Sequence, residues 1–291
     1  AVTMTGELSD LFESRQKGVK ILAESLTAGF GQKARFFVGQ RGFGDAHTAK
    51  TYPDDTGSMN FLASAQAVGR RRNTALFIDF GSTTVDIIAV RSGVPETLGL
   101  SDVERQATGE LVYTGLTRTA AMGVAATAPL HGKWVGLARE HLATMADVRR
   151  VLGDDLEGID VHATADGRGK SLEASFVRMA RLFGSDSDAA TPAAWRVSAA
   201  YIREAQLGSI VDGACLVLSS RSLPHNSPVV TAGIGAHEAA EVSRRLGRTS
   251  ESFGQILGLE GELMMSATHH APAVAVALLL LEAKKTPMGL G

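Results

Sequence analysis

One cysteine, Cys215, is present among 291 residues, so no disulfide can form within this sequence. Disulfides are rare where thiols are kept reduced, and a cytoplasmic location is therefore predicted. A strong charge of one sign is also missing: the formal net charge is −2, which gives no indication of a nucleic-acid partner. The apolar run from Ala271 to Leu281 is shorter than the roughly 20 residues that cross a bilayer, so it predicts a core helix and no membrane partner.

Zinc-binding patterns and repeats are missing as well. The histidines show no spacing of the His-Glu-x-x-His type, and no internal repeat of short period is visible. The composition is ordinary for a globular protein, with 44% hydrophobic and 21% charged residues. A chain of 291 residues suits one large domain or two lobes.

The most informative stretch is a predicted hairpin from Thr74 to Val90. It begins with a short apolar run of β-type residues, typical of a buried strand. Gly81–Thr84, with the sequence Gly-Ser-Thr-Thr, is the predicted turn, and the chain returns from Val85 as a second strand. Asp79 and Asp86 stand on either side of this turn.

Phosphate binding is the chemistry that suits this hairpin. Gly81 lets the backbone approach a ligand closely, and the turn N–H groups with the hydroxyls of Ser82, Thr83 and Thr84 can cradle anionic oxygens. Asp79 and Asp86 can hold Mg²⁺, which then bridges to phosphate oxygens. The alternative is a polar hairpin turn with an aspartate at the strand end.

Other candidate site residues lie after the hairpin. The segment 102–113 is dense in polar groups, among which Glu110 can supply a base or a Mg²⁺ contact and Arg105 can pair with a carboxylate or a phosphate. A plain surface loop is the alternative there. The loop 161–169, which contains Asp166, is interpreted as a substrate or lobe-contact loop, although Asp-Gly alone is also a turn signal.

A second glycine turn occurs near the C-terminus. Residues 228–247 predict a strand, a glycine turn and a helix. Gly233 and Gly235 would place backbone N–H groups at the helix N-terminus, which is an anion site, although a lone Gly-x-Gly is weak evidence.

Helical and strand patterns fill the rest of the chain. Apolar spacing predicts a helix over about 8–27, with Thr5 as its cap and Glu7 in its first turn. The other predicted elements are a strand over 34–39, a mobile loop over 41–57, a helix over 60–68, two helices around a loop within 137–183, and a helix entered at Thr191-Pro192.

The hairpin resembles the phosphate loop of the actin, sugar-kinase and heat-shock ATPase superfamily. Within it the sequence is most similar to the hydantoinase/oxoprolinase branch, and there to the tetrahydromethanopterin-linked C1-transfer proteins of methanofuran biosynthesis. The segments that carry the resemblance, besides the hairpin, are 2–10, 15–19, 102–105, 108–115, 144–148 and 164–168.

The resemblance implies an α/β, two-lobed actin-like/ribonuclease-H-like ATPase fold. Residues 1–73 would be the remainder of the first lobe, and 74–291 the second lobe with inserted helices. Such proteins begin with a strand and a first phosphate loop, whereas this sequence opens at Ala1 beyond that point. The expectations are therefore an N-terminally incomplete first lobe, weak diphosphate binding and self-association into a homo-oligomer.

The activity that the resemblance implies is a transferase reaction. It would join an aminomethylfuran methyl diphosphate to the phenol of a tyrosine or tyramine derivative and release diphosphate, with Mg²⁺ as cofactor. Asp86 or Glu110 would be the base, and Glu7 is a site candidate by resemblance, against a plain capping role. The alternatives are an ATP-dependent amide hydrolase of the oxoprolinase type and a non-catalytic partner of a C1-pathway enzyme.

Overall fold

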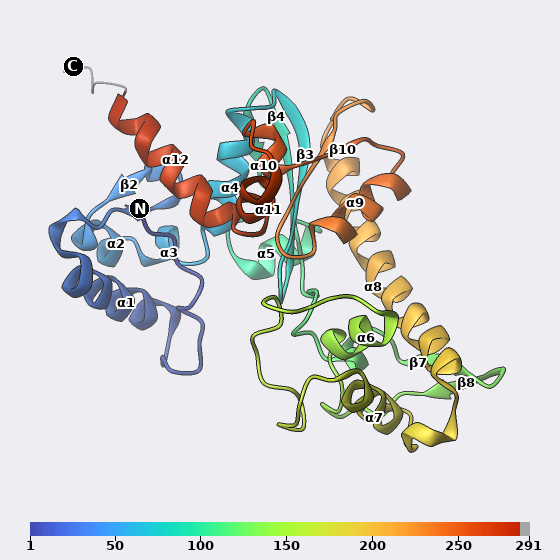
Figure 1. The fold of residues 1–291 in the computed structure, drawn as a ribbon. Coiled ribbons are helices and arrows are strands. Elements are labelled where there is room, and N and C mark those ends of the chain that lie inside the picture. The colour runs from blue at the N-terminus through green and yellow to red at the C-terminus, as the bar shows by residue number, and fades with distance from the viewer. Residues whose placement is uncertain (286–291) are drawn as a thin grey trace.

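The computed structural model describes residues 1–285, and its architecture is mixed α/β (Figure 1). The predicted α/β class is therefore confirmed. A six-stranded mixed sheet forms the centre, with the order β10-β9-β3-β4-β5 and β6 paired to β4. Its strands are β3 (Thr74–Phe80), β4 (Val85–Arg91), β5 (Val94–Glu96), β6 (Leu111–Val112), β9 (Val229–Ala232) and β10 (Ser250–Ser252).

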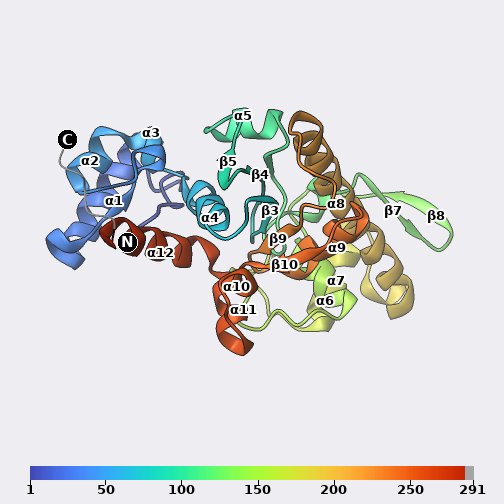
Figure 2. The same ribbon diagram turned by 90° about the horizontal axis from the view of Figure 1, so that it is seen from above.

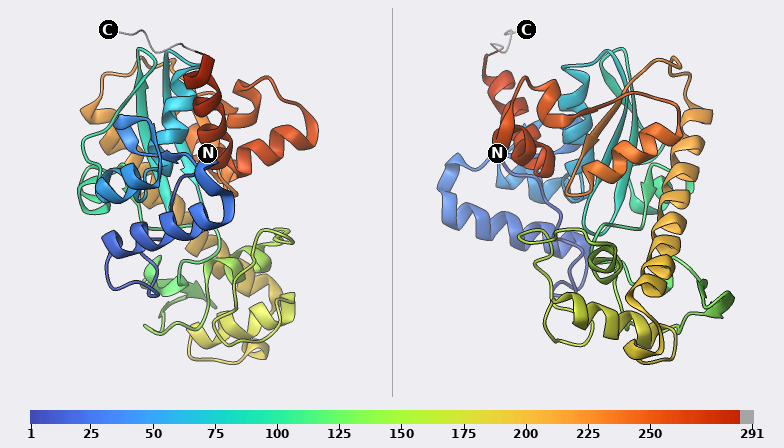
Figure 3. Two further views of the ribbon diagram at one scale, coloured as in Figure 1. Left: turned by 90° about the vertical axis from the view of Figure 1, so that its left-hand side faces the viewer. Right: turned by 45° about the vertical axis from the view of Figure 1, so that its right-hand side comes forward.

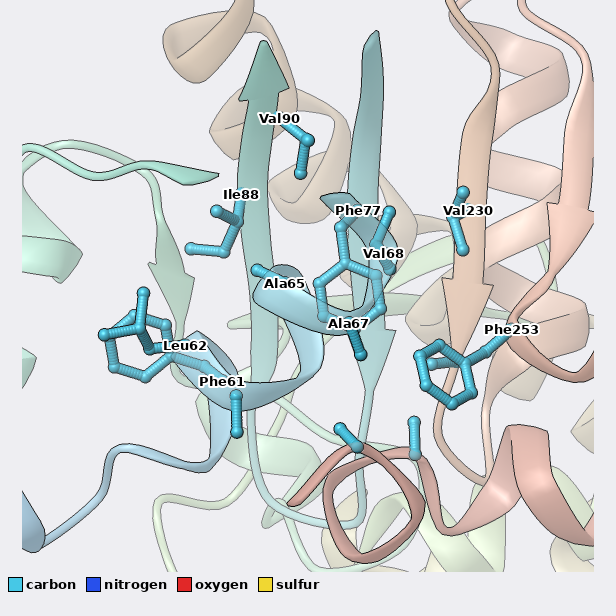
Figure 4. Close-up of a cluster of buried hydrophobic side chains, with 14 of the residues drawn as sticks. Phe61, Leu62, Ala65, Ala67, Val68, Phe77, Ile88, Val90, Val230 and Phe253 are labelled. Atoms are coloured by element: carbon cyan, nitrogen blue, oxygen red, sulfur yellow. The ribbon is translucent and has the colours of Figure 1, made fainter. Parts of the chain in front are cut away.

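Helices cover both faces of this sheet. Helices α4 (Asn60–Gly69) and α12 (Ala271–Lys285) pack on one face, and α8 (Pro192–Ser220) with α9 (Ala236–Arg245) packs on the other. Alternate residues of β3 and β4 enter the two cores, because side chains of a strand alternate between faces. Phe77 and Ile88 thus point toward α4 (Figure 4), while Leu76 and Ile87 lie in the core under α8 and α9.

The N-terminal elements form a body of their own beside the sheet (Figure 2). They are α1 (Arg15–Phe30), β1 (Phe36–Phe37), β2 (Phe43–Gly44), α2 (Ala46–Thr51) and α3 (Pro53–Thr56), with 3-10 turns at Gly31–Lys33 and Gly39–Arg41. The predicted helix over 8–27 is wrong at its start, because the Ser14 side chain accepts from the Lys17 N–H and caps the helix there. Thr5 and Glu7 therefore precede α1.

Two further predictions for this region need correction. The predicted loop over 41–57 contains two short helices, since Asp45 caps α2 and Pro53 opens α3. The predicted strand over 34–39 is reduced to Phe36–Phe37, which pairs with the equally short β2. The predicted helix over 60–68 is confirmed as α4.

A third body lies at one end of the sheet and is tied to it by α8 (Figure 3). It contains β7 (Thr127–Leu130), β8 (Lys133–Gly136), α6 (Met145–Leu152), α7 (Leu172–Leu182) and the 3-10 turns Ala121–Gly123 and Ser187–Ala189. The two predicted helices around a loop are confirmed as α6 and α7. The helix entered at Thr191-Pro192 is confirmed as α8, whose Thr191 side chain accepts from the Ala194 N–H.

Three short helices complete the fold: α5 (Asp102–Ala107), α10 (Phe253–Ile256) and α11 (Gly261–His269). Within residues 1–285 no single helix is long and apolar enough to cross a membrane, although α11 and α12, bent by 97°, pass that test as a pair. The predicted division into lobes at residue 73 stays a prediction. Helix α4, which it assigns to the first lobe, packs on the central sheet.

Candidate functional site

The carboxyl ends of two parallel neighbours, β3 and β9, bring the candidate residues together. The register pairs Asp79 of β3 with Asp86 of β4 on one side and with Ala232 of β9 on the other. Cross-strand partners share a face and have Cβ atoms about 5 Å apart, so both carboxylates lie on the face that α4 covers. Open α/β sheets bind ligands at this edge.

The turn between β3 and β4 is a cradle of unused donors. The Gly81 N–H donates to the Thr84 carbonyl at 3.0 Å, which closes the turn. The N–H groups of Ser82, Thr83 and Thr84 have no acceptor among residues 1–285. The Ser82 and Thr83 hydroxyls lie 3.4 Å apart. An anion placed over the turn would meet amides and hydroxyls together.

Residues 115–118 support this turn from outside. The N–H of Leu116 donates to Gly81 O and that of Arg118 to Ser82 O, both at 3.0 Å. Gly115 touches the turn backbone so closely that an added Cβ would lie 2.3 Å from the Ser82 carbonyl carbon. The Arg118 guanidinium also donates to the Thr83 hydroxyl at 3.2 Å, which places a cation beside the turn.

Arg118 is a site residue that the sequence analysis missed. It lies 35 residues from Thr83 along the chain, and it follows no recognisable phosphate-binding motif. Its only signal is the nearby Gly115, whose need for close approach becomes visible only in the fold.

Asp86 is committed to a buried ion pair. Its Oδ1 accepts from Arg105 Nη2 at 2.6 Å, and the Arg105 guanidinium lies 3.5 Å over the ring of Phe61. Both charged residues are buried. Arg105 thus pairs with a carboxylate, as one of its two predicted roles required, and Asp86 retains only Oδ2 for another partner.

Asp79 has no such partner. No donor of the described residues lies within hydrogen-bonding distance of its carboxyl group, although the residue is buried. Burial, and then the charge of Asp86, raise the pKa of Asp79 to about 8. At neutral pH without a cation, Asp79 therefore holds a proton.

This pKa gives a test of the electrostatics by stability. An unfolded aspartate has a pKa of about 3.9, so the folded state binds the extra proton and loses stability as pH rises from about 4 to about 8. Asparagine resembles the protonated acid and does not ionise. We expect the stability advantage of Asp79→Asn over the parent in urea denaturation to grow between pH 5 and pH 8.5, by up to about 4 kcal/mol. Equal stability of the two proteins at both pH values would contradict the raised pKa.

The second glycine turn is formed, but its amides are already used. The predicted strand, turn and helix are confirmed as β9, Gly233–Gly235 and α9. The Gly233 N–H donates to Thr268 O, however, and the Gly235 N–H donates to Phe80 O. The prediction that these two glycines offer free amides to an anion is therefore wrong. They are needed for packing, since a Cβ on Gly233 would lie 2.4 Å from Asp79 Oδ1.

Two other predicted residues, Glu110 and Asp166, do not line the site. Glu110 is buried and accepts from the N–H groups of Leu98 at 2.7 Å and Gly99 at 3.3 Å. Asp166 accepts from Arg178 at 3.1 Å and holds its own loop. Both carboxylates are already satisfied by neighbours, so the structure indicates a structural part for each of them.

Glu7 is buried next to residues that line the cavity. It precedes α1 and does not lie, as the sequence had predicted, in the first turn of a helix. The Ser58 hydroxyl donates to its Oε1, and Arg15 Nε lies 3.7 Å from the same oxygen. Its Oε2 has no partner among the described residues. The neighbouring Gly6 and Leu8 form part of the wall described next.

A cavity of about 1000 Å³ opens over the turn. Of the predicted site residues, those that line it are Asp79, Gly81, Ser82, Thr83, Thr84, Asp86, Arg105 and Gly233. Glu7, Gly235, Glu110 and Asp166 are not among its lining residues. The chain segments that meet here come from the N-terminal body, the sheet, the third body and the start of α12.

Two groups of side chains could attract a cation. Asp154, His237 and Glu238 have ligand atoms within 4.8 Å of one another, but Glu238 is already paired with Arg149 and Arg203. That charge is neutralised, so a cation gains little there. At the cavity, Asp79 offers an unpartnered carboxyl group, and hard oxygen donors of this kind fit Mg²⁺.

Comparison with known proteins gives the family. The family model described as Hydantoinase/oxoprolinase matches residues 1–200. The (4-{4-[2-(gamma-L-glutamylamino)ethyl]phenoxymethyl}furan-2-yl)methanamine synthase of Methanocaldococcus jannaschii is 29% identical over 190 residues, which are 65% of this chain and 57% of that protein. The chain thus matches a little over half the length of that relative. Because the family model matches more than half of the chain, the protein belongs to the hydantoinase/oxoprolinase family.

Proposed function

We propose that this protein is a transferase of methanofuran-type cofactor biosynthesis, which forms an aryl ether and releases diphosphate. The name of the similar synthase describes a furan joined to a phenol through an oxymethyl group. A furan-methyl diphosphate and a phenolic acceptor would give that linkage. Both substrates are small molecules, and the cavity of about 1000 Å³ has room for them together.

One observation carries the proposal. The turn 81–84 lines the cavity and has three N–H groups without acceptors among the described residues, and Arg118 and the unpartnered Asp79 line the same cavity. Donors fixed before the reaction stabilise the charge that develops on a leaving diphosphate. A site for a neutral substrate would have no need of this arrangement.

The reaction would run as a displacement at the furan-bearing carbon. The bond from that carbon to the diphosphate oxygen breaks, and its electron pair leaves with the diphosphate. The phenol oxygen forms the new ether bond and gives its proton to a base. Asp79 lines the cavity and has no hydrogen-bond partner among the described residues. In its ionised form it is the base that we assign, because its pKa, raised to about 8, approaches that of a phenol, about 10.

The earlier candidates for the base are less suited. Asp86 is held by Arg105, and Glu110 by two amides behind the cavity wall. A bound Mg²⁺ would neutralise charge on the diphosphate, and the free oxygen of Asp86 would be its protein ligand, which leaves Asp79 to take the proton.

We further infer that the molecule has a two-lobed fold of the actin-like ATPase type. The inference is supported by the mixed sheet, in which the antiparallel hairpin β3–β4 lies beside the parallel strand β9 with helices on both faces. A cleft at the end of that hairpin is expected for such a fold.

An ATP-dependent amide hydrolase is the second candidate, since the family model carries hydantoinase and oxoprolinase in its description. The two activities differ in what they release. We expect the protein with Mg²⁺, a furan-methyl diphosphate and a tyramine derivative to release diphosphate in the absence of ATP. Formation of ADP and phosphate from ATP with a cyclic amide would favour the hydrolase instead.

Substitution of Asp79, with Asp166 as a control position, tests the proposed base. We expect Asp79→Asn to lower the rate of diphosphate release by at least about 100-fold, the usual contribution of a general base or acid. Asp166→Asn serves as the control, because that residue lies outside the cavity lining. An Asp79→Asn protein with the parent rate would remove Asp79 from the mechanism.

A further inference from the structure

Strand β6 carries a tyrosine to the edge of the turn. The register pairs Leu111 with Asp86 and Val112 with Val85, and Tyr113 follows directly after this strand, close to the start of β4. Side chains alternate along a strand, and Val112 packs into the core under α8. Leu111 therefore faces the other way and lines the cavity, as does Tyr113 just beyond the strand.

Tyr113 is open to that cavity. Its exposed fraction is 61%, and it has no hydrogen-bond partner among the described residues. Two other large apolar side chains of the cavity wall are more than half exposed, Leu8 at 56% and Val161 at 74%. They come from the N-terminal body and from the loop before α7, so three separate segments present uncovered apolar surface to one cavity.

The cavity thus has two unlike sides. The turn with Arg118 offers donors and a positive charge, while Tyr113 and its apolar neighbours offer contact area beside it. A ligand that satisfies both sides carries an anionic group a short distance from a flat apolar ring.

We propose that Tyr113 binds the ring of the diphosphate-bearing substrate by stacking, with the diphosphate on the turn 81–84. This proposal rests on the proposed function and adds the residue that selects an aromatic donor. The ring of the donor is assigned here, and not that of the phenol, because Tyr113 follows the residue paired with Val85, lines the same cavity as the turn, and a single methylene joins the donor ring to the diphosphate. The tyrosine hydroxyl plays no part in this contact.

The test uses two stable probes and calorimetric titration with Mg²⁺: methylenebisphosphonate alone and its furfuryl ester. In the parent protein, we expect the furfuryl group to strengthen binding about tenfold, as stacking and burial of a ring are worth about 1.4 kcal/mol. Tyr113→Leu should lose that tenfold gain and bind methylenebisphosphonate as the parent does. Tyr113→Phe should keep the gain.

Tyr52→Leu is the matched control, because Tyr52 lies outside the cavity lining and stacks with Arg41 instead. It should behave as the parent with both probes. The proposal is overturned if the furfuryl group adds no affinity, or if Tyr113→Leu weakens both probes equally. If the parent binds neither probe, the proposed function itself fails, and the two failures are thereby distinguished.

Discussion

Replacing Gly115 with alanine is expected to weaken the binding of diphosphate analogues by about 100-fold or more. The new Cβ would lie 2.3 Å from the carbonyl carbon and oxygen of Ser82 and from the N–H nitrogen of Thr83. These are backbone atoms of the turn, so the turn itself must shift. Loss of two charge-assisted hydrogen bonds, at about 1.5–3 kcal/mol each, corresponds to weaker binding by a factor of about 100 or more.

The fold should survive this change with a smaller penalty. Overpacking typically costs about 1–3 kcal/mol, which urea denaturation will measure beside the calorimetric titration. Gly123→Ala is the matched control, since no atom lies within 4 Å of its added Cβ. We expect that variant to bind as the parent does. A Gly115→Ala protein with full affinity would mean that the turn 81–84 is not where the anion binds.

Replacing Arg105 with methionine is expected to destabilise the protein strongly. The change leaves the carboxylate of Asp86 buried and unpaired opposite Asp79, and breaking a buried ion pair from one side costs about 3–5 kcal/mol. Methionine keeps much of the contact with the Phe61 ring, so lost packing contributes little. The measurement is the free energy of unfolding from urea denaturation at pH 7.

A double variant separates charge from packing. Asp86→Asn combined with Arg105→Met removes both charges and should recover part of the loss, because no uncompensated charge then stays buried. Arg91→Met is the control, since its ion pair with Glu96 is half exposed and such pairs contribute about 1 kcal/mol or less. If Arg105→Met and Arg91→Met lower the free energy of unfolding by similar amounts, the buried ion pair contributes no more to stability than the exposed one.

The hairpin was predictable because everything that defines it is local. An apolar run, a turn of small polar residues and a second apolar run occur within seventeen positions, from Thr74 to Val90. Strand geometry then places Asp79 opposite Asp86 without further information. The same holds for α8, whose start is marked by Thr191 and Pro192.

The partners of the site residues were not predictable, because they depend on contacts distant in sequence. Asp86 is satisfied by a residue 19 positions away, and the Gly233 amide by Thr268. The turn at 233–235 was predicted correctly from local sequence, but the N–H groups of Gly233 and Gly235 donate to residues distant in sequence. In the N-terminal body, the apolar spacing from Leu8 suggested a helix, yet Ser14 offered the capping side chain and the helix begins after it.

Helix α8 has a consequence for the rigidity of the site. Its 29 residues correspond to about 43 Å, and its first half packs into the third body through Trp195 and Ile202 while its second half lies under the sheet. At its middle, Gln206 donates to the Thr114 hydroxyl and to the carbonyl of Gly115, each at 2.8 Å. Both halves of α8 are thus packed against other parts of the protein. Its midpoint is hydrogen-bonded to residues 114 and 115, next to the segment that supports the turn. A change in the angle between the third body and the sheet would therefore act on the two hydrogen bonds of Gln206, which lie next to the turn that is proposed to bind the anion.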